Sequence, residues 1–540
     1  MDYFKRNPNF SILKNYILND PLLDWFEINN DQYKRDDYSY YREYIIKEAN
    51  NYKDELLKKI YKLSKLSIPL NTDFHTTKKL IEEKSPLILR GKLLDNNGYY
   101  VGCDIVIQYS LFKRIFPYIR NLPFHILCKE DDYLLINISY ASLHFKMDLK
   151  DVINEGLILY KKCELYAFRE IFNEWIRKKC QCFIISKEYY YKKTLLPKKE
   201  FICKVSIDEN IKLIFNNALQ WIIFLKENRN MMDIYPFPTH HELYPNMNYK
   251  ESSWENEKLK LANEIKEITL VWNISYDKRC QLLNQNIKCW DDPKLLNELK
   301  ETKKKNIQEQ MIHMNQQNEI LIHPRKTISK DFQIILNKTN NDIYFDIESF
   351  LSFDEKRNMD TIVNNPILAI IGYIYNEKFY DHTIQGFSKE NERQIVKSFA
   401  DQLHKISRNN VINIYHWGHA ENRYFQYIKD NYTDILFPEY KLIDVLDYFR
   451  MEPIIVQGVF QFGLKSIGKA LYKNKLIKTT WDEYDNGLDT MIHFKELCKN
   501  HNKNIPIKRY LEIKKIINYN RVDCQVLYEI VELLRNKYDH

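Results

Sequence analysis

Asp346 and Glu348 have the clearest potential for chemistry, because they lie two positions apart within the short apolar stretch 344–350. In a β-strand, successive side chains point to opposite faces, so both carboxylates would lie on the same face. Two carboxylates this close repel each other unless a positive charge lies between them. A divalent metal ion held by carboxylate oxygens would supply that charge. The alternative is a surface strand that carries two solvated acids.

Two further motifs follow this stretch in the chain. The segment 411–421 predicts an apolar strand, a turn and the start of a helix with Glu421 in its first turn. Near the C-terminus, Tyr519 and Asp523 lie in a predicted helix and are four residues apart, so they share one helix face. An acid pair on one strand, an acid after a later strand and an acid on the last helix together indicate a metal-dependent nuclease.

The chemistry of such a site follows from its donor atoms. Four carboxylates can hold two divalent ions roughly 3.5–4 Å apart, of which one activates a water and the other stabilises the leaving oxygen of a phosphodiester. We therefore expect Mg²⁺ or Mn²⁺ as the cofactor, and we expect Tyr519 to orient the water. The predicted metal ligands are Asp346, Glu348, Glu421 and Asp523.

These motifs resemble the three motifs of the DEDD exonucleases of the RNase H-like superfamily, in the subclass with tyrosine in the third motif. The second motif of typical members carries aspartate, whereas this chain has Glu421 in a His-Trp-x-x-Ala-Glu context, with Asp444 as the alternative. That context resembles the RNase H-like domain fused to RecB-like nuclease domains in bacterial and giant-virus proteins. The resemblance covers about the last 200 residues. It implies an RNase H-like mixed sheet flanked by helices and a 3′–5′ exonuclease activity.

The elements expected for that sheet occur in order. Three strands are predicted at 344–350, 367–374 and 380–384, followed by a helix from about 390 to 406, the strand from Val411 and a strand at 442–446. Further helical stretches are predicted near 464–467 and from 511 onward. Lys465, at an expected helix start, and Arg521, on the last helix, are the predicted contacts for nucleic-acid phosphates. For Arg521, the alternative is a solvated helix charge.

The N-terminal region has a different order of elements. Strands are predicted at 87–93, 102–107, 133–140 and 183–186, with a helix from 156 to about 179 before the last of them. This order is similar to the PD-(D/E)xK nuclease core of RecB-like proteins, a restriction-endonuclease-like α/β fold.

Most positions of that family's site carry the wrong residue here. Asp104 keeps the first acid, but Asn137 and Ser139 replace the second acid and the lysine. The family's helix motif of Gln and Tyr corresponds to Glu164 and Phe168. The resemblance therefore implies a degenerate nuclease domain, unless Lys162 on the helix replaces the missing lysine.

The chain is thus expected to be a mixed α/β protein with four parts. Prolines at 236 and 238 predict a loop, and the stretch 254–283 has helical periodicity. The stretch 291–317 is rich in Lys, Glu and Gln and predicts a solvated helix and linker. The alternative for this stretch is a basic brace along nucleic acid. The predicted parts are a helical N-terminal region 1–65, a degenerate PD-(D/E)xK domain 66–235, a helical connector and basic linker 236–335, and a DEDD exonuclease domain 336–540.

Composition agrees with a nucleic-acid partner without proving one. The 540 residues carry a net charge of +8, the sign that phosphates attract. The N-terminus lacks the apolar core of a signal peptide, no apolar run is long enough to cross a bilayer, and ten scattered cysteines suit a reducing interior. We therefore expect an intracellular protein, in the host cytoplasm if it is viral, with no membrane partner.

The sequence leaves the substrate and the partners open. DNA and RNA are equally compatible with it, and so are exonucleolytic and endonucleolytic cleavage. The resemblance implies a helicase or a replication or repair protein as a candidate partner, because relatives of this arrangement can be fused to helicases. The alternative function is a catalytically inactive scaffold that binds nucleic acid or protein through two nuclease folds.

Overall fold

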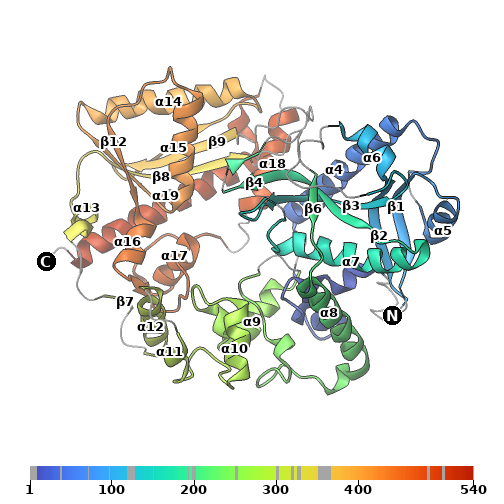
Figure 1. The fold of residues 1–540 in the computed structure, drawn as a ribbon. Coiled ribbons are helices and arrows are strands. Elements are labelled where there is room, and N and C mark those ends of the chain that lie inside the picture. The colour runs from blue at the N-terminus through green and yellow to red at the C-terminus, as the bar shows by residue number, and fades with distance from the viewer. Residues whose placement is uncertain are drawn as a thin grey trace. The chain divides into compact units, whose positions relative to one another are not determined.

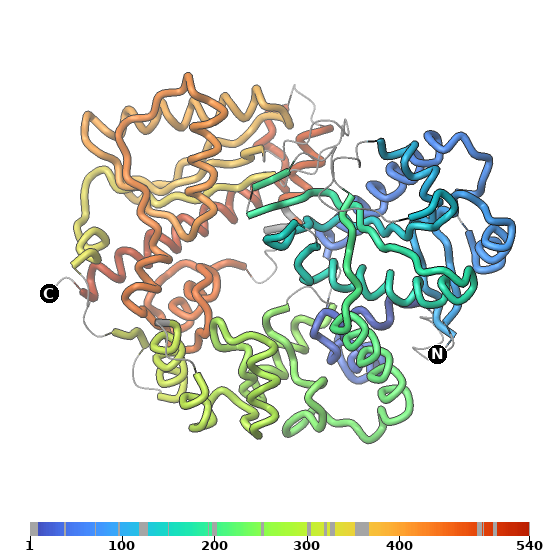
Figure 2. Tube along the Cα trace, viewed as in Figure 1, coloured from blue at the N-terminus to red at the C-terminus, as the bar shows by residue number. Residues whose placement is uncertain are grey.

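The chain forms two compact units, which divide near residue 265, within the predicted connector. The structure is a computed structural model with a mixed α/β fold (Figures 1 and 2). It describes residues 9–36, 39–70, 72–95, 98–117, 128–149, 151–192, 194–196, 202–249, 253–299, 303–317, 321–324, 330–350, 367–482, 487–500 and 505–538.

The N-terminal unit contains a mixed sheet in the order β1-β2-β3-β4-β5, with β6 also pairing with β4. Among the described strand pairs of this sheet, β3–β4 is parallel and the others are antiparallel. The strands are β1 (Leu87–Leu94), β2 (Tyr100–Gln108), β3 (Tyr133–His144), β4 (Gln181–Tyr191), β5 (Thr194–Leu195) and β6 (Cys203–Val205). The four strands predicted here are confirmed, whereas the short β5 and β6 were not predicted.

Two long helices cover this sheet. Apolar residues of α4 (Tyr40–Ser64), including Leu57 and Ile60, share one buried core with the strands, while α7 (Gly156–Ile176) contacts β2 and β3. The other helices of this unit are η1 (Phe10–Leu13), α2 (Lys14–Ile17), α3 (Leu22–Ile28), α5 (Phe74–Glu82), α6 (Tyr109–Ile115), α8 (Glu209–Asn228), η4 (Arg229–Met231), η5 (His241–Leu243) and α9 (Glu255–Glu264).

The helical stretch expected at 254–283 is interrupted. After α9 ends, Lys266 adopts a left-handed conformation with φ of 54° and breaks the helix. A 3₁₀ turn, η6 (Ile268–Leu270), and α10 (Tyr276–Asn284) follow. Helical periodicity therefore identified the apolar positions here but not the break between the helices.

The C-terminal unit is built on a five-stranded sheet in the order β10-β9-β8-β11-β12. Strand β8 (Asp342–Phe350) lies at the centre, antiparallel to β9 (Ile367–Tyr375) and parallel to β11 (Ile412–His416). The edge strands are β10 (Lys378–Thr383), which is antiparallel to β9, and β12 (Tyr440–Asp444), which is parallel to β11. The predicted meander of three strands is confirmed, and its first strand, β8, carries the acid pair and is the central strand of the whole sheet.

Helices cover both faces of this sheet (Figure 1). Helices α14 (Lys389–Ser407) and α15 (His419–Asn431) contribute to a core with Phe345 and Ile347 of β8. The later turns of α19 (Leu511–Tyr538) contribute to a second core with Tyr344, on the opposite face of the same strand. Every second residue of β8 lies on the same face of the sheet, so Asp346 and Glu348 share the face of Tyr344 and point toward α19.

The remaining elements of this unit complete the two cores or connect the strands. They are α11 (Leu295–Glu298), α12 (Lys303–Gln316), β7 (Ile322–His323), η7 (Lys330–Phe332), α13 (Gln333–Leu336), α16 (Val445–Met451), β13 (Ile455–Val456), α17 (Leu464–Lys473), α18 (Gly487–Asn500) and η8 (Ile507–Arg509).

Helix α12 corrects one interpretation of the sequence. The stretch 291–317 was expected to be a solvated helix and linker, but Ile307, Met311 and Met314 are buried in the same core as Tyr344. One face of α12 is therefore part of the C-terminal unit, and only its other face is polar.

Candidate functional site

Two acids on β8 and one on α19 come together in the C-terminal unit. One carboxylate oxygen from each of Asp346, Glu348 and Asp523 lies within 4.8 Å of the others, and all three side chains are half-buried. Asp346 and Glu348 share a face because they are two residues apart on the strand, and α19 crosses that face. The structure thus brings together three of the four predicted metal ligands at one point.

Glu421 is the fourth predicted ligand, and it lies close to these three acids. It is buried in the first turn of α15, and its charge raises the pKa of both Asp346 and Glu348. Its Oε2 atom is buried without a hydrogen-bond partner and lies 3.7 Å from Nδ1 of the buried His416. Asp346, Glu348, Glu421 and Asp523 are called the acid cluster below.

The turn before α15 explains how Glu421 reaches this position. Gly418 has a φ of 100°, a conformation that residues with a side chain rarely adopt, and it joins the end of β11 to the helix. Asp444, the alternative ligand, holds this turn instead: its Oδ1 accepts hydrogen bonds from the backbone N–H groups of Gly418 (2.8 Å) and Leu446 (3.0 Å). Of the two candidates, Glu421 is therefore the one that the structure places with the other acids.

Asp346 is held by a residue that the sequence analysis did not single out. The fully buried Asn520 donates a hydrogen bond from Nδ2 to Asp346 Oδ2 at 2.7 Å. Gly372 pairs with Asp346 across β9 and β8, and a Cβ atom at Gly372 would lie 1.7 Å from Asn520 Oδ1. Glycine at this position therefore leaves the space in which Asn520 reaches the acid.

Asp523 has a similar partner. The indole Nε1 of the buried Trp481 donates a hydrogen bond to Asp523 Oδ1 at 2.9 Å. The role of Asn520 could have been predicted from the sequence, because its amide lies three residues before Asp523 in the same predicted helix. No signal in the sequence pairs Trp481 with Asp523, because 42 residues separate them.

The electrostatics of the acid cluster favour a bound cation. Burial raises the pKa of Glu348 to about 8, and the charges of Asp523 and Glu421 add to that shift. Burial and the same neighbouring acids also raise the pKa of Asp346 well above its ordinary value. Within the described part of the chain, no lysine or arginine forms a salt bridge with Asp346, Glu348 or Glu421. A donor set made only of carboxylate oxygens is one that a hard divalent cation can occupy.

Tyr519 and Lys465 lie together. Tyr519 is half-buried on α19 one turn before Asp523, and the Lys465 ammonium lies 5.5 Å from the centre of the Tyr519 ring. Lys465 is in the first turn of α17, as expected from the sequence. Arg521 is exposed on α19, where its guanidinium donates two hydrogen bonds to Asn518 Oδ1, at 2.8 and 3.1 Å.

The N-terminal unit also groups polar residues, but it pairs them differently. Asp104 on β2 accepts a hydrogen bond from the backbone N–H of Ile138, and its other oxygen lies 2.6 Å from Lys53 Nζ. Asn137 on β3 accepts a bond from the Asp104 N–H and donates one to Glu164 Oε2 at 2.8 Å. Asp104 and Asn137 are therefore adjacent, as the resemblance implies.

The lysine proposed to complete this site is elsewhere. Lys162, the alternative for the missing lysine, is fully buried and pairs with Asp151 Oδ1 at 2.8 Å rather than with Asp104. Lys161 lies beside the site instead, 2.7 Å from Glu164 Oε2. Ser139 is buried, and its hydroxyl accepts a hydrogen bond from the N–H of Ala141. Each acid of this site is thus already compensated by a lysine of the same unit.

Comparison of the chain with family models, with curated proteins and with solved structures finds no match. The resemblance to DEDD exonucleases and to RecB-like proteins therefore stays a prediction. Among the described residues, no helix combines the length and the apolar composition needed to cross a bilayer.

Proposed function

We propose that this chain is a metal-dependent nuclease that hydrolyses phosphodiester bonds through its C-terminal unit. The observation that carries the proposal is the acid cluster, in which Asp346, Glu348 and Asp523 converge and a buried Glu421 oxygen has no hydrogen-bond partner. Three of these closely spaced acids have no lysine or arginine to neutralise them, so the group can be fully ionised only when a cation is bound.

The four carboxylates would hold Mg²⁺ or Mn²⁺, which, when bound, supply Lewis-acid activation of water and stabilise the charge on a leaving oxygen. The chain's own residues have separate roles in this proposal. Asn520 donates a hydrogen bond to Asp346 and Trp481 donates one to Asp523, so each would orient its acid toward the ion. Tyr519 would orient the attacking water, and Lys465 beside it would contact the substrate phosphate.

The substrate follows from the same chemistry. A site of buried acids and divalent ions beside Lys465 suits the phosphodiester backbone of DNA or RNA, and the net charge of +8 supports attraction to either. The 3′–5′ direction of cleavage and a helicase or a replication or repair partner are implied by the resemblance. An intracellular location, the host cytoplasm for a viral protein, agrees with ten cysteines that are all free.

A scaffold that binds nucleic acid or protein without catalysis is the second candidate. It is favoured by the N-terminal unit, where Lys53 and Lys161 already compensate Asp104 and Glu164. The two candidates differ in what happens after binding. A scaffold binds nucleic acid in EDTA and never cleaves it, whereas the nuclease requires a divalent ion for turnover.

The test is degradation of end-labelled single-stranded DNA and RNA by the full chain, in Mn²⁺ or in EDTA. We expect the wild type to produce a metal-dependent ladder from the 3′ end, and we expect Asp346→Ala to show no detectable cleavage. Glu390→Ala, an exposed acid in the first turn of α14, is the matched control and should cleave like the wild type. Wild-type cleavage by Asp346→Ala would contradict the assignment, and binding without cleavage in any metal would favour the scaffold.

A further inference from the structure

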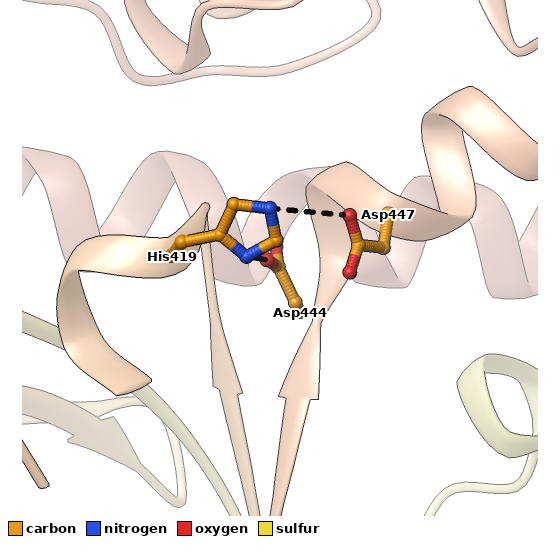
Figure 3. Close-up of side chains that lie close together, drawn as sticks. All are labelled: His419, Asp444 and Asp447. Carbon is orange, nitrogen blue, oxygen red and sulfur yellow. Dashed lines mark ion pairs between the residues drawn. The ribbon is translucent and has the colours of Figure 1, made fainter. Parts of the chain in front are cut away.

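A second group of potential metal ligands lies in the C-terminal unit, outside the acid cluster. It consists of His419 at the start of α15, Asp444 at the end of β12 and Asp447 in the first turn of α16 (Figure 3). One ligand atom of each lies within 4.8 Å of the others. We propose that these three residues, called the His–Asp cluster, bind a divalent transition-metal ion such as Zn²⁺ or Mn²⁺.

The sheet topology brings these residues together. Strands β11 and β12 are parallel neighbours, and His416 at the end of one pairs with Asp444 at the end of the other. Both strands therefore end at the same edge of the sheet. The turn at Gly418 then places His419 over Asp444, and α16 begins at Val445, directly after Asp444. The cluster therefore joins the first turns of two helices that follow adjacent strands.

A buried oxygen points to a ligand here. Asp444 is only 8% exposed, and its Oδ1 is engaged by the N–H groups of Gly418 and Leu446. Its Oδ2 is buried without a hydrogen-bond partner and lies 3.4 Å from His419 Nδ1. A buried carboxylate oxygen without a partner destabilises the folded state, and more so when it is charged. A cation between Asp444 and the imidazole would satisfy this oxygen.

A simple ion pair accounts less well for the arrangement. The His419 side chain is 65% exposed, and its other nitrogen lies 3.9 Å from Asp447 Oδ1. Ion pairs that involve an exposed side chain contribute little to stability, and neither contact has hydrogen-bond geometry. In Figure 3 the imidazole of His419 lies beside the Asp444 carboxylate, and dashed lines mark its ion pairs with Asp444 and Asp447.

The donor set distinguishes the His–Asp cluster from the acid cluster. One imidazole nitrogen and two carboxylate oxygens suit Zn²⁺ or Mn²⁺, whereas Mg²⁺ prefers oxygen ligands only. Three protein ligands leave a further coordination position for water. The inference does not depend on nuclease activity, because none of the three residues belongs to the acid cluster. A bound ion would tie the start of α15, and with it the turn before Glu421, to the start of α16.

The test measures metal binding directly. The full chain carrying Asp346→Ala and Glu348→Ala, which removes two ligands of the acid cluster, is titrated with Mn²⁺, and the free ion is measured by its electron paramagnetic resonance signal. We expect one Mn²⁺ per chain to bind, Zn²⁺ to displace it, and Mg²⁺ at the same concentration to leave it bound. Mn²⁺ is the primary probe because it has little affinity for the free cysteines.

Two added substitutions then locate the ion. His419→Ala removes an exposed ligand, and Asp444→Asn replaces Oδ2 by an amide nitrogen while Oδ1 can still accept from Gly418 and Leu446. Each should raise the dissociation constant of Mn²⁺ by at least about tenfold. The matched control is His313→Ala, an exposed histidine on α12, which should leave it unchanged. Circular dichroism confirms that the variants are folded.

Three results would overturn the proposal. They are a failure of the Asp346→Ala/Glu348→Ala chain to bind Mn²⁺, an unchanged dissociation constant in both His419→Ala and Asp444→Asn, and equal displacement of the ion by Mg²⁺ and Zn²⁺. Since no nucleic acid is present in the experiment, its failure leaves the proposed nuclease untouched. Likewise, a failure of cleavage leaves this metal site standing.

Discussion

Single residues decide how the two polar sites differ. In the C-terminal unit, Glu348 and Glu421 lie near other acids, and no lysine or arginine of the described chain pairs with either. In the N-terminal unit, Asp104 pairs with Lys53 at 2.6 Å. A cation has a large electrostatic gain in the first site and little in the second. Metal-dependent chemistry is therefore proposed for the first site only.

The pKa of Glu348 gives a stability test without substrate. Its folded-state pKa is about 8 against an ordinary value of 4.5, so the folded chain keeps a proton that the unfolded chain releases between these values. In EDTA, stability should therefore fall as pH rises from about 4.5 through about 8. Glu348→Gln should remove this loss of stability. Its melting temperature should therefore exceed that of the wild type by several °C at pH 8 and by little at pH 5, because each kcal/mol of stability changes the melting temperature by about 2–4 °C.

The control for this experiment is Glu390→Gln, because Glu390 is an exposed acid on the same unit. Its melting temperature should follow the wild type at both pH values. A gain for Glu348→Gln that is equal at pH 5 and pH 8 would show that the carboxyl group is not buried among other acids.

Asn520 is a positioning residue for Asp346 under the proposed function. Its amide fixes one Asp346 oxygen at 2.7 Å, and hydrogen bonds of this kind to metal ligands typically affect metal affinity by about 10–100-fold. Asn520→Ala should therefore need about 10–100-fold more Mn²⁺ for half-maximal cleavage, with much of the activity recovered at saturating Mn²⁺. Asn536→Ala, on the exposed face of the same helix, should behave like the wild type. A loss of activity that Mn²⁺ does not recover would indicate misfolding instead.

At the scale of elements, periodicity predicted the scaffold of the candidate site. The alternation of apolar residues along 344–350 identified the strand, and the four-residue spacing of Tyr519 and Asp523 identified the helix face. The acids lie within β8, in the first turn of α15 and within α19, and the order of these elements was enough to predict that the acids converge. The contacts of Asn520 and Trp481 were not predictable, because they depend on how α19 and the segment after α17 pack in space.

The misread elements failed for local reasons. Periodicity continues across 254–283, but a single left-handed residue, Lys266, ends the helix. In α12, the charged residues at 303–305 suggested a solvated helix, whereas Ile307 and Met311 further along the helix are buried. Composition averages over both faces of a helix and therefore hides a narrow apolar stripe.

The packing of α12 can be tested through Met311, one of its most buried apolar side chains. Met311 is 1% exposed and lies in the core that α19 and Tyr344 share. Met311→Ala should lower the free energy of unfolding of the C-terminal unit by about 2–5 kcal/mol, the usual cost of truncating a buried methionine. Urea unfolding followed by fluorescence measures this change. Asn306→Ala, on the exposed face of α12, should change it by less than about 0.5 kcal/mol, and an equally small effect of Met311→Ala would restore the linker interpretation.

At the scale of the whole molecule, both clusters of potential metal ligands lie in one of the two compact units. The complete acid cluster, the His–Asp cluster and both cores that enclose the five-stranded sheet lie after residue 265. The N-terminal unit has its own sheet and core, and its acids are neutralised from within. If catalysis needs only the acid cluster, it needs only the second unit.

This division leads to the last prediction, which rests on the proposed function. A fragment of residues 266–540 contains nearly all of the C-terminal unit, so it should unfold cooperatively in urea and cleave end-labelled nucleic acid in Mn²⁺. The fragment 1–265 should fold and show no cleavage, because Lys53 occupies the position beside Asp104 where a metal ion would bind. Asp346→Ala in the fragment 266–540 is the control for a contaminating nuclease. Cleavage by 1–265 that is lost in Asp104→Ala would move the activity to the first unit, whereas a folded but inactive 266–540 would mean that the substrate must be held by both.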